Sequence, residues 1–249
     1  MKKPAVLIAV LLALSATGSV YAMTNQQAKE FADAAYKGNA ADLTKLISDA
    51  KTGDVNAQVG LGFYYAVKKK YAQAIYWQKR AAKQGDAHAE YNLGLVYHQG
   101  HGVPQNYAQA HYWFQKAAKQ GLAEAEYDLG SDYYKGQGVP QNYTKSDYWF
   151  QKAAKQGLAE AEDGIGMAYY KGHGVPQNYA QAHYWFQKAA KQGLAEAEYG
   201  LGYIYIYGHD VPQDTKTAIY WWKKAAAQGG EYGKKAQHNI NIAEHNSTE

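Results

Sequence analysis

The sequence has no cysteine, and phenylalanine and proline occur only five times each among its 249 residues. Without cysteine the chain can form no disulfide, so packing alone must stabilise its fold. Beyond residue 14 no apolar run approaches the roughly 20 residues that a helix needs to cross a bilayer, so no membrane span is expected. The net charge is +4, with lysines interspersed among acids and glutamines. This lack of a basic stripe predicts no nucleic-acid partner.

The long apolar run of the chain lies at its start, within MKKPAVLIAVLLALSATGSVYA. Lys2 and Lys3 precede about 10 apolar residues, and small residues end the segment at Ala22. This order is typical of a secretory signal peptide. Residues 1–22 are therefore expected to be a signal peptide, and the protein to be exported, either periplasmic or secreted.

Aromatic residues and glycines follow one period. The sequence has 25 tyrosines and 6 tryptophans, and five of the tryptophans stand 36 residues apart. The periodic residues are Trp77, Trp113, Trp149, Trp185 and Trp221, with Gly85, Gly121, Gly157, Gly193 and Gly229 in step. A fixed period of this length indicates stacked supersecondary units.

The clearest unit, residues 87–121, predicts two antiparallel helices, each with apolar residues at helical spacing. Gly100 is placed to end the first helix, because glycine accepts the left-handed backbone of a helix end. Pro104 cannot continue a helix interior. Asn106 is placed to cap the second helix, which is expected to close at Gly121.

One hairpin cannot bury its apolar stripe alone, so the units are expected to stack into an all-α, right-handed superhelical solenoid. The segments are predicted as a degenerate hairpin at 23–53, a short repeat at 54–85, full repeats at 86–121, 122–157, 158–193 and 194–229, and a capping helix with a tail at 230–249. The short repeat has a loop that is four residues shorter and lacks the Gly-Val-Pro element.

A set of spaced positions recurs with this period. In the first full unit they are Ala89, Leu93, Gly94, Tyr97, Gly100, Gly102, Val103, Ala110, Trp113, Lys116, Ala117, Ala118 and Gly121. In these residues the chain resembles the Sel-one-like repeat (SLR), a branch of the tetratricopeptide-type (TPR-like) α-solenoids. The resemblance implies a non-catalytic scaffold or adaptor that binds a protein or peptide, with a role in envelope assembly or host interaction.

Two positions depart from the family pattern. Asparagine stands in place of the capping aspartate at Asn106, Asn142 and Asn178, and Asp210 stands where the other full units have glycine. Both changes are expected to be mild for the fold.

A cysteine-rich exported branch of the same family resembles penicillin-binding and β-lactamase proteins, so a β-lactam-processing envelope enzyme is the alternative function. The absence of cysteine removes the defining feature of that branch. SDAKTG at 48–53 fits both Ser-x-x-Lys and Lys-Thr-Gly, but both motifs would share Lys51, although they come from separate elements in such enzymes. Lys51 is therefore interpreted as a helix end, and no catalytic residue is predicted.

The histidines recur by position: His101, His173 and His209 in a loop, His111 and His183 on a second helix. Metal ligands must meet at one ion about 2 Å away. Equivalent residues two hairpins apart lie on the order of 20 Å or more from each other. No metal site and no cofactor are therefore predicted, and the loop histidines are interpreted as solvated or polar.

The AEAE segments carry paired acids: Glu124 with Glu126, Glu160 with Glu162, and Glu196 with Glu198. Residues two apart on a helix do not face each other. They lie in a first turn, where negative charge suits the helix dipole. The dipole is taken as sufficient to explain them.

A partner is expected on the first helices, which line the concave face of helical-hairpin solenoids. Each first helix carries a Leu-Gly pair, or Ile-Gly in one unit, and positions are counted from its leucine or isoleucine. Positions −5, −2, +2 and +5 share one helical face, and unlike the buried positions they vary between units. The predicted binding residues are Phe63, Tyr91, Leu95, His98, Tyr127, Ser131, Tyr134, Asp163, Met167, Tyr170, Tyr199, Tyr203 and Ile206. Tyrosine is enriched in binding hot spots. The alternative is that these rings only pack between neighbouring first helices.

Overall fold

The computed structural model describes residues 40–245, which form twelve α-helices and no strand. The helices are α3 (Ala40–Thr52), α4 (Val55–Val67), α5 (Tyr71–Lys83), α6 (Ala87–Gln99), α7 (Tyr107–Lys119), α8 (Ala123–Lys135), α9 (Tyr143–Lys155), α10 (Ala159–Lys171), α11 (Tyr179–Lys191), α12 (Ala195–Tyr207), α13 (Thr215–Gln228) and α14 (Gly230–His245). The predicted signal peptide, residues 1–22, lies outside the described residues, together with 23–39 of the predicted first hairpin and 246–249 of the predicted tail. Within the described part of the chain, no helix has the length and apolar character to cross a bilayer.

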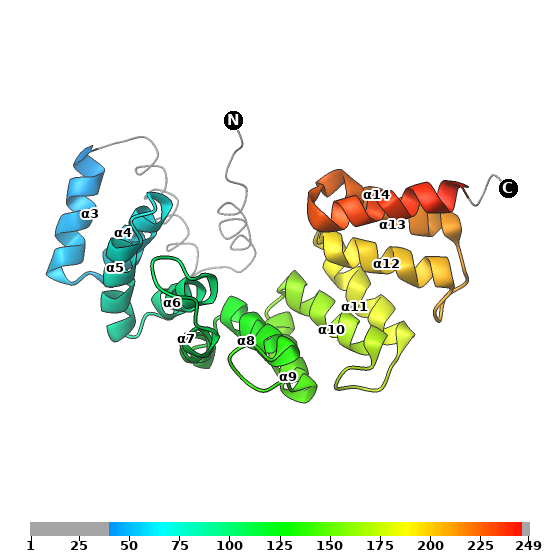
Figure 1. The fold of residues 1–249 in the computed structure, drawn as a ribbon, viewed down its shortest axis with the longest axis horizontal. Helices are drawn as coiled ribbons and strands as arrows, with labels where there is room; N and C mark the ends of the chain where they lie inside the picture. Colours follow the sequence, from blue (N-terminus) through cyan, green and yellow to red (C-terminus); the bar gives the residue numbers. More distant parts are fainter. Residues whose placement is uncertain (1–39, 246–249) are drawn as a thin grey trace. The chain divides into compact units, whose positions relative to one another are not determined.

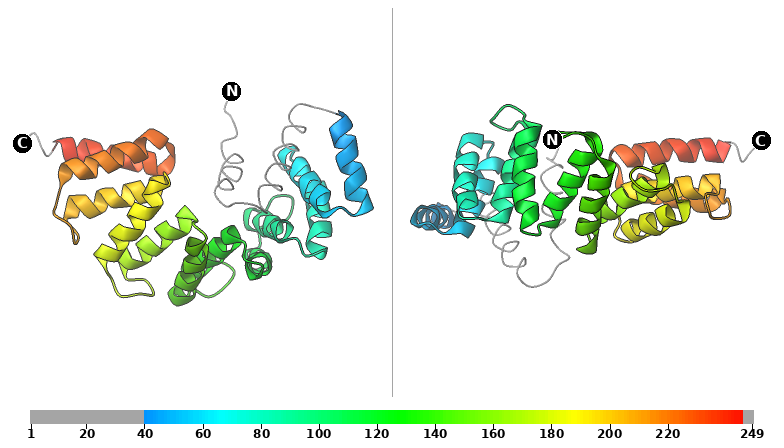
Figure 2. Two further views of the ribbon diagram at one scale, coloured as in Figure 1. Left: turned by 180° about the vertical axis from the view of Figure 1, so that it is seen from behind. Right: turned by 90° about the horizontal axis from the view of Figure 1, so that it is seen from below.

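The described helices belong to two compact units, with the boundary inside α8. The first unit runs to Ala125 and includes Gln137–Val139, and the second comprises Glu126–Gly136 and the chain from Pro140 onward. In the first unit α4 lies against α5, and α6 against α7 (Figure 1). In the second unit α10 lies against α11, and Figure 2 shows α12, α13 and α14 side by side. The prediction of an all-α solenoid of helix hairpins is confirmed.

The predicted capping residues set the helix ends. The side chains of Asn106, Asn142 and Asn178 each accept a hydrogen bond from the backbone N–H three residues on, at 2.9 to 3.0 Å. Asp214 does the same for α13. Gly100 ends α6 in the left-handed conformation, with φ 72°. These local predictions are confirmed.

Asp210, the departure from glycine in the last loop, also has a left-handed backbone, with φ 53°. Aspartate visits this conformation more readily than most residues. Its carboxylate accepts a hydrogen bond from the Ala180 N–H at 3.2 Å, in the first turn of α11. A negative charge there suits the positive end of the helix dipole. Asp210 therefore connects the last loop to the preceding hairpin.

Within each full hairpin, a glycine of the first helix faces an aromatic ring of the second. A Cβ added at Gly166 would lie 2.7 Å from the Phe186 ring, well inside van der Waals contact. The matching pairs are Gly94 with Phe114, Gly130 with Phe150, and Gly202 with Trp222. The two helices therefore approach to a distance that only glycine permits, and Phe186 is left 1% exposed.

An ion pair between a buried glutamate and a partly exposed lysine also joins the two helices of every full hairpin. Glu90, Glu126, Glu162 and Glu198 have side chains at most 2% exposed, and each carboxylate lies 2.6 to 3.2 Å from a lysine Nζ of the second helix. The other carboxylate oxygen accepts a hydrogen bond from a glutamine amide at 2.7 to 2.9 Å. We call each set a Glu–Lys–Gln clamp; the lysines are Lys116, Lys152, Lys188 and Lys224, and the glutamines are Gln120, Gln156, Gln192 and Gln228.

Each clamp lysine also lies over the tryptophan three residues before it, with Nζ 4.7 to 5.0 Å from the ring centroid. The tryptophan face attracts the cation, and the ring shields the ion pair on one side. The interpretation of the AEAE acids is therefore wrong for Glu126, Glu162 and Glu198. Burial in an ion pair, rather than the helix dipole alone, accounts for them.

The short repeat replaces the clamp with neutral groups. Gln58 stands where the other hairpins have glutamate; its amide donates to the Ala50 carbonyl at 3.1 Å. Its side-chain oxygen accepts from the Gln84 amide at 3.0 Å. Arg80 lies 5.4 Å over the Trp77 ring. This hairpin therefore keeps the contact between a cation and the tryptophan ring but buries no carboxylate at the clamp position.

The clamp predicts that two glutamates of the second unit contribute very different amounts to the free energy of unfolding. Glu162→Ala is expected to lower the free energy of unfolding by about 2 kcal/mol, because it removes the buried ion pair and one acceptor of Gln192. Glu244 is the matched control, since its pair with Lys223 is exposed on both sides; Glu244→Ala should cost less than about 0.5 kcal/mol. Urea unfolding followed by circular dichroism measures both. Equal losses would contradict a stabilising clamp.

Candidate functional site

The thirteen predicted binding residues are all half-buried, and they fall in both units. Phe63 lies on α4 of the first unit, and Tyr91, Leu95 and His98 lie on α6. In the second unit α8 carries Tyr127, Ser131 and Tyr134; α10 carries Asp163, Met167 and Tyr170; and α12 carries Tyr199, Tyr203 and Ile206. Half-burial leaves each of them one side for packing and one for contact.

The packed side of the tyrosines faces the second helix of the same hairpin. Tyr91 lies 5.6 Å from Phe114, and Tyr127 lies 5.5 Å from Phe150, between ring centroids. Tyr203 meets Trp222 edge-on at 5.8 Å. Ile206 packs against the same core as Trp222. These contacts order the rings without covering them completely.

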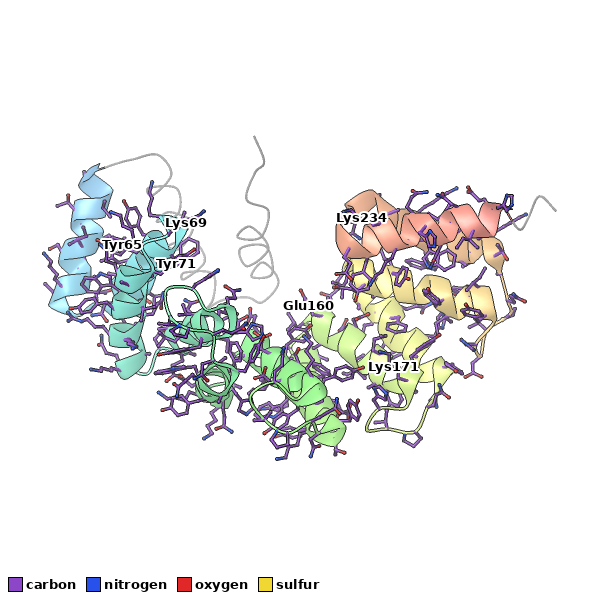
Figure 3. All side chains as sticks on the ribbon, in the orientation of Figure 1. Tyr65, Lys69, Tyr71, Glu160, Lys171 and Lys234 are labelled. Atoms are coloured by element: carbon purple, nitrogen blue, oxygen red, sulfur yellow. The ribbon has the colours of Figure 1, made fainter. Side chains whose placement is uncertain are left out.

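Tyr134 is used between hairpins. Its hydroxyl lies 3.2 Å from His173 Nδ1 and accepts a hydrogen bond from Lys171 Nζ at 3.3 Å. Lys171 lies at the end of α10, as Figure 3 shows. The ring of Tyr134 also meets the ring of Tyr143 edge-on, with centroids 5.3 Å apart. For Tyr134, structural packing therefore accounts for much of the side chain.

The loop histidines stack on tyrosines of the preceding hairpin, a contact that the sequence analysis did not predict, while His101 stays exposed and His173 also makes a polar contact through Nδ1. The ring centroids are 5.0 Å apart for His101 and Tyr71, 4.4 Å for His173 and Tyr143, and 3.9 Å for His209 and Tyr179. The interplanar angles are 15°, 17° and 9°. The histidines thus act as contacts between successive hairpins. Within residues 40–245 no group of three or more metal-ligating side chains gathers.

Helices α10, α12 and α14 enclose a pocket of about 230 Å³ in the second unit. Its lining residues are Asp163, Met167, Tyr170, Glu196, Tyr199, Tyr203 and Tyr232. Five of these belong to the predicted binding residues: Asp163, Met167, Tyr170, Tyr199 and Tyr203. A face predicted from helical spacing thus becomes concave where α14 closes it.

Two lining residues were not among the predicted binding residues. Glu196 occupies the −5 position of the same helical face, so the spacing places it on that face, but its charge was explained by the helix dipole and it was not chosen as a binding residue. Tyr232 lies in the first turn of α14, outside the 36-residue period, so no repeat register assigned its face. The signal that would have found it is a tyrosine two residues after the glycine pair Gly229 and Gly230, both with positive φ, at which the chain turns and brings α14 against α12.

The pocket concentrates carboxylates that repel one another. Burial, with the neighbouring charges of Glu196 and Glu160, raises the pKa of Asp163 to about 8. Burial also raises the pKa of Glu196, with further contributions from Glu160 and Glu231. Figure 3 places Glu160 at the start of α10. The pocket therefore favours protonated acids when it is empty, and would favour ionised acids beside a cation.

The tyrosines of the pocket contact one another. The hydroxyls of Tyr199 and Tyr203 lie 3.1 Å apart. Tyr199 also meets Tyr232 edge-on, with centroids 5.6 Å apart. Burial, and then the hydrogen bond with Tyr203, raise the pKa of Tyr199 to about 12, so its phenol stays neutral. The rings supply apolar faces and hydroxyl groups at the same place.

The motif that carried the enzyme alternative lies on one helix. Ser48 is exposed on α3, and Lys51 lies in the last turn of that helix. Thr52 donates its hydroxyl to the Asp49 carbonyl at 2.8 Å, and Gly53 follows with φ 107°. The interpretation of Lys51 as a helix end is therefore confirmed.

The carboxyl of Asp163 predicts a pH-dependent stability. The native state keeps a proton that the unfolded chain releases near pH 4, so the stability that Asp163 contributes is complete below about pH 4 and is lost as the pH rises towards 8. Asp163→Asn is expected to leave the melting temperature unchanged at pH 4 and to raise it by roughly 5 °C at pH 9. Thermal melts of both proteins at the two pH values measure this. A difference that is the same at both pH values would show that Asp163 is not a buried acid.

Comparison with known proteins finds five consecutive repeats in this chain. The family model described as Sel1 repeat matches residues 55–86, 87–122, 123–158, 159–194 and 195–230. The chain is 39% identical to a protective antigen present in uropathogenic Escherichia coli strains and displaying an SLR fold, with a TM-score of 0.73, over 80% of this chain and 43% of that one. It is 36% identical to a Sel1 repeat protein from Oxalobacter formigenes, with a TM-score of 0.65, over 78% of this chain and 58% of that one.

The chain thus spans about half the length of these two relatives. No curated protein matches it. Proteins built from Sel1 repeats generally mediate protein–protein interaction and are typically non-catalytic scaffolds. With five matched repeats over residues 55–230, the chain belongs to the Sel1 repeat family.

Proposed function

We propose that the protein is a non-catalytic interaction scaffold that binds a protein or peptide on the half-buried face of its first helices. The observation that carries the proposal is that this face varies between hairpins while caps and clamps repeat, and that its variable positions line a pocket in the second unit. Identical hairpins offer a partner identical contacts, so specificity for one partner must come from residues that differ between hairpins.

The exposed tyrosines of the second helices give a contrast within the same molecule. Tyr76, Tyr112, Tyr148, Tyr184 and Tyr220 are 51 to 56% exposed, and each lies edge-on to the next residue, a periodic tryptophan. They recur in every hairpin and line no part of the pocket. The tyrosines of the second helices are thus exposed and lie outside the pocket, whereas the first-helix tyrosines Tyr170, Tyr199 and Tyr203 are half-buried and line it.

The proposal includes export of the protein, periplasmic or secreted, with a role in host interaction or envelope assembly. The order of charged, apolar and small residues in 1–22 supports export. The relative that is a protective antigen of uropathogenic strains supports contact with a host. The partner is then a protein or peptide of the envelope or of the host surface.

A photo-crosslinker at a pocket position tests the proposal. Replacing Met167 by p-benzoylphenylalanine is expected to yield a cross-linked partner peptide from envelope extract or host-cell membranes, because Met167 lines the pocket. The same replacement of Tyr184, exposed on α11, is the control and should not yield it. Mass spectrometry identifies the peptide, and a synthetic copy is then titrated against the intact chain by calorimetry.

The titration is repeated with two double variants. Tyr170→Ala with Tyr199→Ala is expected to weaken binding of the synthetic peptide at least about tenfold, since tyrosine truncation in a hot spot often costs about 2 kcal/mol. Tyr148→Ala with Tyr184→Ala removes two exposed rings and should leave the affinity unchanged. Unchanged binding in the pocket variant, with its helical melt intact, would contradict the proposed surface.

A further inference from the structure

The pocket of the second unit holds acids without a positively charged partner. Within residues 40–245 the side chains of Asp163 and Glu196 make no hydrogen bond and no ion pair, and the charges that act on them are those of other acids. Carboxylates that lose part of their hydration and have no positively charged partner are costly, so they are uncommon unless something compensates them. The pocket acids, half-buried and unpaired, thus differ from the clamp glutamates of the second unit.

The clamps show how this chain treats a buried carboxylate elsewhere. Glu126, Glu162 and Glu198 each have a lysine Nζ within 3.2 Å and a glutamine amide on the other oxygen. Among the described residues, nothing comparable reaches Asp163. The nearby cation on α14, Lys235, is 2.7 Å from Glu231 and lies 5.1 Å over the Tyr232 ring. The part of the chain that the structure describes therefore supplies the acids of the pocket without a compensating cation, which another molecule can provide.

The tyrosines of the pocket also suit a positively charged ligand. Tyr170, Tyr199, Tyr203 and Tyr232 line the pocket together with the acids, and the face of an aromatic ring attracts a lysine or arginine head group. The clamps already use this contact, with lysine Nζ about 5 Å from a tryptophan ring. A volume of about 230 Å³ lies below the range of drug-sized sites and suits one long side chain.

The sequence also sets this pocket apart from the other hairpins. Asp163 stands at the −2 position, where the first helices of three other hairpins carry Tyr91, Tyr127 and Tyr199. It ends the diverged repeat copy that lies between two identical copies, 100–127 and 172–199. The acid is therefore a feature of one hairpin rather than a property of the repeat.

The geometry points to a recognition site for one basic side chain, lysine or arginine, held between the carboxylates of Asp163 and Glu196 and the rings of Tyr170, Tyr199, Tyr203 and Tyr232. The statement that this side chain belongs to a partner peptide rests on the proposed function. The pocket chemistry itself does not, because any molecule that presents the same head group meets the same surfaces.

Binding of the cation is expected to tighten as the pH rises. The charged and titratable groups around Asp163 are Glu160 on its own helix, Glu196 on α12, Tyr127 on α8, and Tyr232 on α14 with the Glu231–Lys235 pair beside it. Since the pKa of Asp163 is about 8 in the empty pocket, a bound cation displaces its proton at neutral pH. A lysine head group stays charged up to pH 9, so the affinity should rise at least about tenfold from pH 6 to pH 9.

The single methionine among residues 40–245 makes the pocket directly observable. The chain has three methionines, and Met167 is the one that lines the pocket. In the full chain labelled with ¹³C-methyl methionine, titration with Nα-acetyl-lysine methylamide or the arginine analogue should shift the Met167 resonance. The norleucine analogue has the same apolar stem without the charge, and it should bind at least about tenfold more weakly.

Charge-neutral variants test the role of the two acids. Asp163→Asn with Glu196→Gln keeps the shape of the pocket and should weaken binding of the lysine probe at least about tenfold. Glu244→Gln is the matched control, because it also removes a negative charge from the second unit but lies about 20 Å along α14 from Glu231; it should leave the affinity unchanged. Equal binding of lysine and norleucine probes, or unchanged affinity in the folded double variant, would overturn the site.

The outcomes separate this site from the proposed function. If the lysine probe shifts Met167 but no cross-linked peptide forms, the basic-side-chain site stands and the scaffold role fails. If a partner peptide binds and depends on Tyr170 and Tyr199 but not on Asp163 and Glu196, the scaffold role stands and the basic-side-chain site is wrong. If the partner peptide loses affinity when its lysine or arginine is replaced by norleucine, both are supported.

Discussion

The structure depends on how each full hairpin satisfies one buried carboxylate. A glutamate of the first helix loses its water, and a lysine and a glutamine of the second helix replace it. Removing either partner would leave a buried charge, so the two helices are held in one register. Gln192 also donates to the Gly157 carbonyl at the end of the preceding hairpin, which extends the same network to its neighbour. The close glycine–ring contact is possible because this register is fixed.

Local sequence signals were sufficient to predict the helix ends and hence the fold. The contacts between the two helices of a hairpin could not be predicted in the same way. Asn106 and Gly100 act within a few residues of themselves, so their roles followed from helix-end chemistry. Glu162 forms an ion pair with a lysine 26 residues later. Its position in a first turn suggested the helix dipole as the explanation, and that explanation was incomplete. The recurrence of glutamate, lysine and glutamine at the same three repeat positions was the available signal. The stacking of His209 was not predicted for the same reason, because its tyrosine lies in the preceding hairpin.

The candidate site was predictable to the extent that one helix determines it. Spacing from the Ile-Gly pair of α10 placed Asp163, Met167 and Tyr170 on one face of that helix, and in the structure all three line the pocket. The depth of the pocket depends on Tyr232, which belongs to a helix outside the repeat register. Whether an acid is paired or unpaired depends on side chains from several helices. A sequence period contains none of that information, so Glu196 was explained by its own helix alone.

Repetition and divergence have separate physical roles in this chain. A residue that repeats in every full hairpin, such as the clamp lysine Lys188, fixes the geometry of that hairpin and offers a partner nothing that distinguishes one full hairpin from another. A residue that breaks the repeat costs stability unless it is compensated. Asp163 is such a residue, since the tyrosine that it replaces would bury an apolar ring at no electrostatic cost. A carboxylate retained against that cost is better explained by a ligand that compensates it than by the fold.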